Sequence, residues 1–165
     1  MLIRPGLFAD CAGINEVELS AGLLFAGTHM DWAVGEVTGA EDLRIGADSN
    51  MLWVAEIDKV IAGFILGGAE GEDFHLREVS VARHFQGQGI GIALVEAALT
   101  AAAKRGFRTA TLTTDLTLRW NAPWYERLGF RILTPEEIPP RLAEKLAEER
   151  NPHLRCAMAR SIAVA

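Results

Sequence analysis

The sequence predicts a mixed α/β fold in which hairpins and helices follow one another without a regular alternation of strand and helix. Two apolar runs separated only by Asp58-Lys59 predict a tight β-hairpin. Apolar residues at helical spacing between Gly89 and Arg105 predict a helix, and the β-branched residues of Thr109–Thr113 predict a strand. A chain of 165 residues is long enough to bury one core, so we expect a single domain over residues 1–165.

The first part of the chain is expected to place short helices before the hairpin. Its elements are a strand at Leu2–Arg4 ended by Pro5-Gly6, a helix from about Ala9 to Gly27, a short helix near Trp32–Val37, a loop at Gly39–Asn50, and the hairpin strands Met51–Ile57 and Val60–Gly67.

The remaining elements are expected to form further strands and three helices. The strands are Phe74–Val81, Thr109–Thr113, Phe130–Leu133 and Leu154–Arg160, and a polar turn at Gly67–Asp73 precedes the first of them. The helices are Gly89–Arg105, Asn121–Leu128 and a charged one at Pro135–Arg150, of which the first two are followed by glycine.

Composition and charge exclude several classes of function. Half of the residues are hydrophobic and 23% are charged, which is typical of globular proteins, and no apolar run approaches the roughly 18 residues of a membrane span. A net charge of −6 argues against general nucleic-acid binding. The start of the chain lacks the features of a signal peptide, so we expect a cytoplasmic protein. Cys11 and Cys156 lie far apart without a metal-binding spacing, and we expect no metal.

The segment with the strongest functional signal is the turn from Gln86 to Gly91, which joins a predicted strand to a predicted helix. Unpaired N–H groups and the positive end of the helix dipole should meet there and attract an anion. The glycines at positions 87, 89 and 91 would let phosphate oxygens approach the backbone. The alternative is a flexible turn that only permits close packing of helix and strand.

Two familiar phosphate-binding motifs do not fit this turn. The dinucleotide fingerprint needs a third glycine after Gly91, where Ile92-Ala93-Leu94 follows, and no acidic residue ends the next expected strand, Thr109–Thr113. The P-loop needs a Gly-Lys-Ser/Thr ending that is also missing. A nicotinamide cofactor and nucleotide hydrolysis are therefore disfavoured.

Two motifs together resemble the GNAT superfamily of N-acetyltransferases. Gln86, Gly89 and Gly91 match the signature turn Q/R-x-x-G-x-G/A, and Leu76–Val81 before it resembles the family's strand L-x-E-L-x-V. Asn121–Phe130 resembles the second motif, N-x-x-x-Y-x-x-x-G-F. The resemblance extends over about Leu2–Phe130. It departs from the family at Arg83, where a proline is common.

The resemblance implies a fold, a cosubstrate and the residues that bind it. The expected fold is a twisted, mostly antiparallel sheet of about six or seven strands, splayed at the cofactor site and flanked by four or five helices. The cosubstrate is acetyl-CoA. Its pantetheine arm would pair with the backbone of Val79 and Val81 and contact Asn121, whose side chain would also cap its helix. Its pyrophosphate would accept hydrogen bonds from the amides of Gln86, Gly87, Gln88, Gly89, Ile90 and Gly91, with Arg83 or His84 at the edge.

The implied reaction transfers the acetyl group to a primary amine by direct attack in a ternary complex. Tyr125, which lies on the helical face of Asn121, would give a proton to the leaving thiolate. Glu78 would take the amine's proton, and His75 or water are alternatives. Either side chain could instead be structural: Tyr125 packed against the cofactor, Glu78 paired with an arginine. A non-catalytic acyl-CoA sensor is the competing function.

The acceptor is left open by the sequence. In the superfamily the segment between the first two helices shapes the acceptor site, which points to Phe25, His29 and Trp32 as substrate-binding residues. The partners expected are acetyl-CoA and an amine carried by a small molecule, a peptide or a protein. A homodimer is considered, although the sequence does not determine the oligomeric state. No nucleic acid and no membrane are expected as partners.

Overall fold

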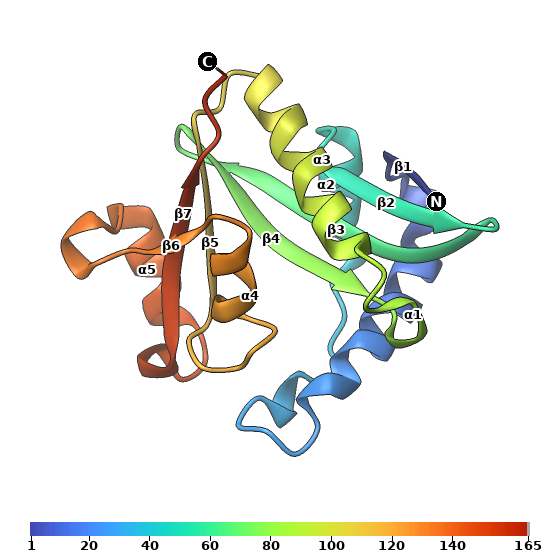
Figure 1. The fold of residues 1–165 in the computed structure, drawn as a ribbon, viewed down its shortest axis with the longest axis horizontal. Coiled ribbons are helices and arrows are strands. Elements are labelled where there is room, and N and C mark those ends of the chain that lie inside the picture. Colours follow the sequence, from blue (N-terminus) through green and yellow to red (C-terminus); the bar gives the residue numbers. More distant parts are fainter. Residues whose placement is uncertain (165) are drawn as a thin grey trace. The chain divides into compact units, whose positions relative to one another are not determined.

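The computed structural model describes residues 1–164 as a mixed α/β fold with seven strands and five α-helices (Figure 1). The strands are hydrogen-bonded in the order β1-β2-β3-β4-β5-β7-β6 and are mostly antiparallel, which confirms the predicted fold class. Residue contacts divide the chain into two compact units. Unit 1 comprises Met1–Gly68 and Glu78–Leu99, and unit 2 comprises Ala69–Arg77 and the residues from Thr100 onward. The single domain and the splayed sheet stay predictions.

The sheet of unit 1 is built on the predicted hairpin. Strands β2 (Leu52–Ile57) and β3 (Val60–Glu70) pair in antiparallel fashion, and β1 (Leu2–Pro5) pairs with β2. Asp58 and Lys59 have φ values of 49° and 65°. Positive φ at both central residues is the conformation of a two-residue type I′ turn, which matches the twist of the strands it joins. The hairpin prediction is confirmed.

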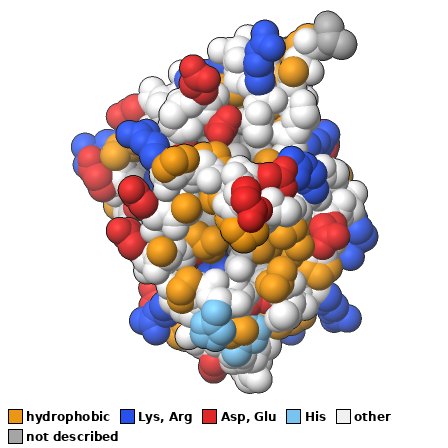
Figure 2. Space-filling model, turned by 90° about the vertical axis from the view of Figure 1, so that its left-hand side faces the viewer, with side chains coloured by type: hydrophobic (Ala, Val, Ile, Leu, Met, Phe, Trp, Pro, Cys, Tyr) orange, Lys and Arg blue, Asp and Glu red, His pale blue; other side chains and the backbone are white. Residues whose placement is uncertain are grey.

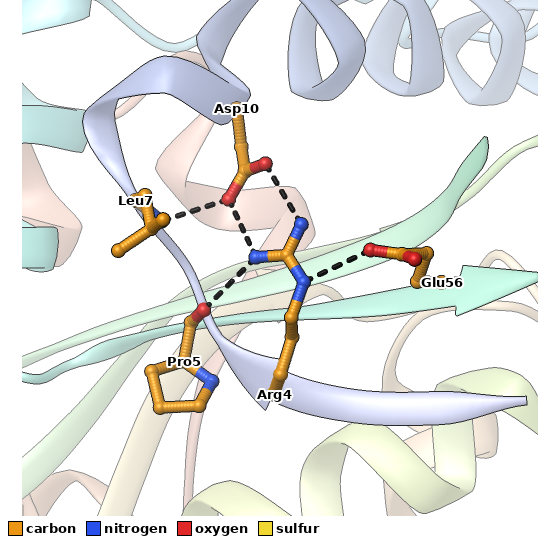
Figure 3. A network of polar contacts seen from close by, with 5 residues as sticks. All are labelled: Arg4, Pro5, Leu7, Asp10 and Glu56. Carbon is orange, nitrogen blue, oxygen red and sulfur yellow. Dashed lines mark hydrogen bonds and ion pairs between the residues drawn. The ribbon is translucent and has the colours of Figure 1, made fainter. Parts of the chain in front are cut away.

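An ion-pair network connects this sheet to the start of helix α1 (Cys11–Gly22) (Figure 3). The Arg4 guanidinium donates to both carboxylate oxygens of Asp10, at 2.9 Å each, and its Nε donates to Glu56 at 3.0 Å. Asp10 also accepts the N–H of Leu7 at 2.8 Å. The acidic residue before α1 therefore fixes the turn that leads from β1 into the helix.

The segment after α1 contains less helix than the sequence predicted. The expected helix to Gly27 ends at Gly22 and is followed by one 3₁₀ turn, η2 (Leu23–Phe25). The expected helix at Trp32–Val37 is only the 3₁₀ turn η3 (Asp31–Ala33). Gly35 has a φ of 86°, a left-handed conformation that a right-handed helix does not contain.

The predicted loop at Gly39–Asn50 is wrong, because helix α2 (Ala40–Asp48) forms there. The buried residues of α2 are Leu43 and Gly46. A Cβ atom at Gly46 would collide with the side chain of Leu66, so glycine is needed for close packing. A glycine within a polar stretch is normally a sign of a loop, and its packing role is visible only in the folded chain.

Helices α1 and α2 pack on one hydrophobic core of unit 1. Its buried residues are Ile14 and Val17 of α1, Leu43 of α2, Leu52, Val54, Phe64 and Leu66 of the hairpin, and Ala82. Ala82 directly follows strand β4 (Asp73–Val81), the last part of which belongs to unit 1. The core therefore anchors the base of the turn that leads into helix α3 (Ile90–Lys104).

Unit 2 is built around strand β5 (Thr109–Asp115). The first part of β4 runs parallel to it, with Phe74 opposite Ala110, and β7 (Arg155–Ser161) runs antiparallel to it. The short strand β6 (Arg131–Ile132) pairs with the other edge of β7. The helices of this unit are α4 (Ala122–Arg127) and α5 (Pro140–Glu148).

Several boundaries differ from the prediction, and strand β5 continues beyond Thr113 to the acidic Asp115, contrary to the expectation that no acidic residue ends this strand. Strand β3 continues to Glu70, so the polar turn expected at Gly67–Asp73 is reduced to Gly71-Glu72. The helix expected at Pro135–Arg150 is divided into a 3₁₀ turn, η5 (Pro135–Glu137), and α5. Pro139 is extended because the next residue is also proline, which disfavours helical backbone before it.

The surface carries both signs of charge. On the face drawn in Figure 2, described acidic and basic side chains are interspersed with hydrophobic ones and do not separate into regions of one sign. None of the helices within residues 1–164 has the length and apolar character needed to span a membrane.

Candidate functional site

The turn between β4 and α3 is held at its base by three contacts within unit 1. The N–H of Ala82 donates to the carbonyl of Ala62 at 2.9 Å. The N–H of Arg83, the first residue of the 3₁₀ turn η4 (Arg83–Phe85), donates to Ser20 Oγ of α1 at 2.9 Å. The side chain of Gln86 donates from Nε2 to the carbonyl of Val81 at 2.9 Å. The first part of the turn is thus fixed, whereas residues 86–89 are exposed.

Beyond these anchors the backbone opens toward solvent at two glycines. Gly87 and Gly89 have φ values of 77° and 80°. Apart from each glycine and its chain neighbours, no heavy atom of the described residues lies within 4 Å of where a Cβ would be at either position. The first bond of the α3 ladder runs from the N–H of Ala93 to the carbonyl of Gly89. The amides before Ala93 in the helix, those of Ile90 and its two successors, have no carbonyl one turn earlier to accept them. This arrangement suits an anion.

Gln86 differs from its predicted role as a backbone donor. Its N–H already donates to the carbonyl of Arg83 at 3.2 Å, and its side chain bonds Val81. The signature glutamine therefore closes the turn onto the end of β4. The amides left for an anion are those further along, from Gly87 to Gly91.

The last part of β4 places the predicted base and the two residues predicted to bind the cofactor in half-buried positions. Glu78, Val79 and Val81 are each partly exposed. Glu78 Oε1 accepts a hydrogen bond from Ser80 Oγ at 2.9 Å. A Cβ at Gly63 would lie only 2.9 Å from the Ser80 carbonyl oxygen, so glycine at this place of β3 lets the end of β4 approach it.

The predicted acceptor residues lie in the segment of η2 and η3. Phe25 is half-buried, His29 is exposed and Trp32 is 37% exposed. The segment turns at Thr28, whose Oγ1 donates to the Phe25 carbonyl at 2.7 Å and accepts the N–H of Met30 at 3.1 Å. Two aromatic side chains and an imidazole are thereby presented by one short, hydrogen-bonded stretch of unit 1.

In unit 2, Asn121 precedes α4 but does not cap it, so the capping prediction is wrong. Its Nδ2 donates to Thr114 Oγ1 of β5 at 2.9 Å. Its Oδ1 is buried and has no hydrogen-bond partner among the described residues. A buried acceptor without a donor is unfavourable, and a ligand N–H would satisfy it.

Tyr125 lies one helical turn after Asn121, and its N–H donates to the Asn121 carbonyl at 3.1 Å. Its side chain is 8% exposed. The ring makes edge-to-face contacts with Trp124, at 4.9 Å between centroids, and with Phe130, at 5.8 Å. The ring is thus packed against two other aromatic side chains.

His75, the alternative base, is almost completely buried, at 2% exposed. Its Nδ1 lies 2.9 Å from Thr111 Oγ1. Burial lowers the pKa of His75 to about 4, with further lowering by Lys145 and Arg77 and an opposing effect of Glu70. A buried imidazole with so low a pKa is a weak proton acceptor near neutral pH, which favours Glu78 over His75 as the base.

Other chemistry-bearing groups lie outside these positions. A cavity of about 370 Å³ in unit 2 is lined by the β3–β4 turn, Thr111 and the start of α5, and none of the predicted site residues lines it. Burial raises the pKa of the Cys156 thiol to about 11, so this thiol stays protonated at neutral pH. Within residues 1–164, no three His, Cys, Asp or Glu side chains are grouped so that they could hold a metal ion.

Two residues that contact the predicted site were missed by sequence reasoning. Ser20 holds the turn at Arg83, and Thr114 holds Asn121. Neither belongs to a motif, and both act as hydrogen-bond partners of residues that are distant in the sequence or on another element. No local signal distinguishes them from other serines and threonines.

Comparison with solved structures shows which fold this is. The PaiA N-acetyltransferase of Thermoplasma acidophilum, in complex with coenzyme A, aligns with a TM-score of 0.72 at 18% identity, covering 97% of this chain and 98% of that one. The N-acetylglutamate synthase of Neisseria gonorrhoeae, with coenzyme A and N-acetyl-glutamate, aligns with a TM-score of 0.77 at 16% identity, covering 99% of this chain and 35% of that one. At these identities the likeness establishes the fold.

Sequence comparison identifies the family. The chain is 32% identical over 98 residues to the probable N-acetyltransferase camello of Xenopus tropicalis, a match covering 56% of this chain and 44% of that protein. The chain thus spans less than half the length of this relative. Residues 48–132 match the family model described as an acetyltransferase (GNAT) domain. This segment is more than half of the chain and contains both motifs on which the resemblance rested. The resemblance is thereby confirmed, and the chain belongs to the GNAT family of acetyltransferases.

Proposed function

We propose that the chain transfers the acetyl group of acetyl-CoA to a primary amine by direct attack in a ternary complex. The observation that carries this proposal is the turn before α3, where two left-handed glycines expose the amides at the start of a 15-residue helix. Helix dipole and free N–H groups favour a pyrophosphate at this point. Family membership supplies the acetyl donor.

The residues present suit the rest of the cofactor as well. Asn121 Oδ1 is a buried acceptor that needs a donor, and the pantetheine arm of coenzyme A carries amide N–H groups. In unit 1, the backbone of Val79 and Val81 would pair with pantetheine, and Gly87, Gln88, Gly89, Ile90 and Gly91 would hold the pyrophosphate. Bound acetyl-CoA supplies a thioester whose carbonyl carbon is open to attack.

Each remaining step is assigned to a residue of this chain. Glu78 accepts the proton that the amine releases as its nitrogen bonds to the carbonyl carbon, directly or through water. The N–H of Val81 or of a neighbour stabilises the negative charge that develops on the carbonyl oxygen. Tyr125 donates its hydroxyl proton to the sulfur as the carbon–sulfur bond breaks.

The acceptor is proposed to contact Phe25, His29 and Trp32. These residues are close in sequence, and the hydrogen bonds of Thr28 keep them in one ordered turn. Aromatic side chains provide apolar contact area that suits the hydrocarbon part of an amine, in a small molecule or in a peptide. A cytoplasmic location and a homodimer remain predictions; light scattering on the purified chain tests the second.

Thiol release tests the proposed function. The purified chain is incubated with acetyl-CoA and a library of small amines and peptides, and products are identified by mass spectrometry. We expect release of coenzyme A that depends on one class of amine and yields an N-acetylated product. Binding of coenzyme A without release for any amine would instead support a sensor that does not turn over.

A further inference from the structure

The hydrogen bond between Ser20 and Arg83 connects helix α1 to the proposed pyrophosphate turn. Arg83 N–H donates to Ser20 Oγ at 2.9 Å, across 63 positions of sequence. Ser20 lies in the last turn of α1, and Arg83 is the first residue of η4. The bond uses the backbone of Arg83 and leaves its side chain exposed.

The backbone at this place has the conformation that proline would impose. Ala82 is extended, with φ −57° and ψ 141°, which is the region favoured before proline. The first position of a helical turn is where proline is best tolerated, because its missing N–H is not needed inside the turn. Arg83 has that N–H, and Ser20 accepts it. In this chain the hydrogen bond to Ser20 restrains the backbone at Arg83, which a proline ring would otherwise restrain covalently.

Few other contacts hold the turn in place, so the hydrogen bond from Arg83 to Ser20 is important for its order. Ala82 and Phe85 pack against the core that contains Ile14 and Val17 of α1, and residues 86–89 are exposed and contain two glycines. Such a segment samples many conformations unless its base is held, and ordering it on binding would weaken affinity. A hydroxyl that holds the first residue of η4 reduces that loss.

We propose that Ser20 is a positioning residue, which keeps the Gly87–Gly91 amides in their anion-binding arrangement by holding the Arg83 N–H. This inference rests on the proposed function, since it assumes that the turn binds the pyrophosphate of coenzyme A. Ser20 acts through the backbone of Arg83 and needs no contact with the cofactor. Its effect should appear in the affinity for coenzyme A and in the order of the turn.

The first test compares coenzyme A binding by calorimetry in Ser20→Ala, Ser20→Thr and Ser49→Ala. Loss of the hydroxyl should weaken binding ~3- to 10-fold, the range expected for one neutral hydrogen bond. Threonine keeps a hydroxyl and should restore most of the affinity. Ser49→Ala removes a serine that bonds the end of its own helix, through the carbonyl of Ile45, and should bind like the wild type. Equal affinity of Ser20→Ala and wild type would overturn the proposal.

A double-mutant cycle separates the amide of Arg83 from its charge. Arg83→Ala keeps the N–H, so adding Ser20→Ala should weaken binding by the same factor as in the wild type. Arg83→Pro removes the N–H and fixes φ, so adding Ser20→Ala should have no further effect. An equal effect of Ser20→Ala in both backgrounds would show that Ser20 does not act through this amide and would overturn the mechanism.

Hydrogen exchange of the unliganded protein provides a readout that does not depend on coenzyme A. The amides of residues 84–91 should exchange faster in Ser20→Ala than in Ser49→Ala, whereas the core strands should be unchanged. If the wild-type chain does not bind coenzyme A, the proposed function fails, and exchange still decides whether Ser20 holds the turn. Unchanged exchange in this segment would overturn the role of Ser20 by itself.

Discussion

Glu18 of α1 holds Thr38 through both of its carboxylate oxygens. The N–H of Thr38 donates to Oε2 at 2.8 Å and its hydroxyl donates to Oε1 at 2.6 Å. Glu18 is only 7% exposed. This pair joins the end of the segment that contains Phe25, His29 and Trp32 to the helix that precedes it. These hydrogen bonds therefore hold the end of the proposed acceptor segment against α1.

Replacing Glu18 tests whether its charge or its hydrogen bonds stabilise the fold. Burial raises the pKa of Glu18 and outweighs the two bonds from Thr38, which lower it. Because the pKa of Glu18 in the folded chain lies above the unperturbed value of 4.5, the protonated side chain favours folding. The contribution of Glu18 to the free energy of unfolding therefore decreases as the pH rises. Glu18→Gln keeps an acceptor and a donor for Thr38. Its free energy of unfolding at pH 7, measured in urea, should equal or exceed that of the wild type.

The alanine variant provides the contrast. Glu18→Ala leaves both donors of Thr38 without their acceptor and should lose about 2 kcal/mol of stability. Glu16→Ala, an exposed glutamate of the same helix, is the control and should change stability little. An equal loss in the glutamine and alanine variants would mean that the ionised carboxylate itself is stabilising.

The buried His75 predicts a dependence of stability on pH. Its folded pKa of about 4 lies below the unperturbed 6.5. Between these values the unfolded chain binds more protons than the folded one, so stability falls as the pH drops. We expect His75 to contribute a loss of roughly 2 kcal/mol between pH 7 and pH 5. Urea unfolding at both values measures this loss.

Two variants assign that loss to His75. In His75→Gln the difference in unfolding free energy between pH 7 and pH 5 should shrink by this amount, whatever the absolute stability of the variant. In His153→Gln, which changes an exposed histidine, the difference should match the wild type. The same pH dependence in all three proteins would show that His75 takes up its proton without unfolding the chain.

The sequence predicted best those features that have a local backbone cause. Asp58-Lys59 flanked by apolar runs determines a hairpin because only a tight turn fits between the strands. Gly87 and Gly89 of the Gln86–Gly91 turn were identified because left-handed backbone and open space need glycine. The two motifs also sufficed to identify the family.

Features that depend on distant partners were not predicted. Helix α2 was missed because the packing of Gly46 against Leu66 appears only after the sheet has formed. Asn121 was expected to cap α4, but its Nδ2 is held by a hydroxyl on β5 and its Oδ1 accepts no N–H of the helix. The anchor of the turn at Ser20 pairs residues 63 positions apart, a distance at which no pattern in a single sequence indicates contact.

The proposed phosphate site predicts that Gly89→Glu abolishes coenzyme A binding. The substitution places bulk and negative charge beside the amides that would hold the pyrophosphate. It also strains the backbone, because φ at Gly89 is 80°. Calorimetry on the folded variant should detect no binding, and unchanged affinity would show that the phosphates bind elsewhere.

Strain and charge are separated by two further variants. Gly71→Glu places the same side chain at another open glycine of positive φ, on the β3–β4 turn, and should bind coenzyme A like the wild type. Gly89→Ala introduces strain without charge and should retain part of the affinity. If Gly71→Glu also lost binding, the effect would come from lowered stability and would not locate the phosphate site.

The proposed general acid is tested by Tyr125→Phe, which removes one hydroxyl and keeps the ring. The ring packs against Trp124 and Phe130, so the variant should fold and should bind coenzyme A nearly as well as the wild type. If Tyr125 gives its proton to the thiolate, the turnover number should fall by roughly 10²-fold or more, while the affinity for coenzyme A measured by calorimetry stays the same. The reverse result, weaker binding with unchanged turnover, would refute the acid role. Tyr125 would then be a binding residue, and water or the substrate ammonium would protonate the sulfur.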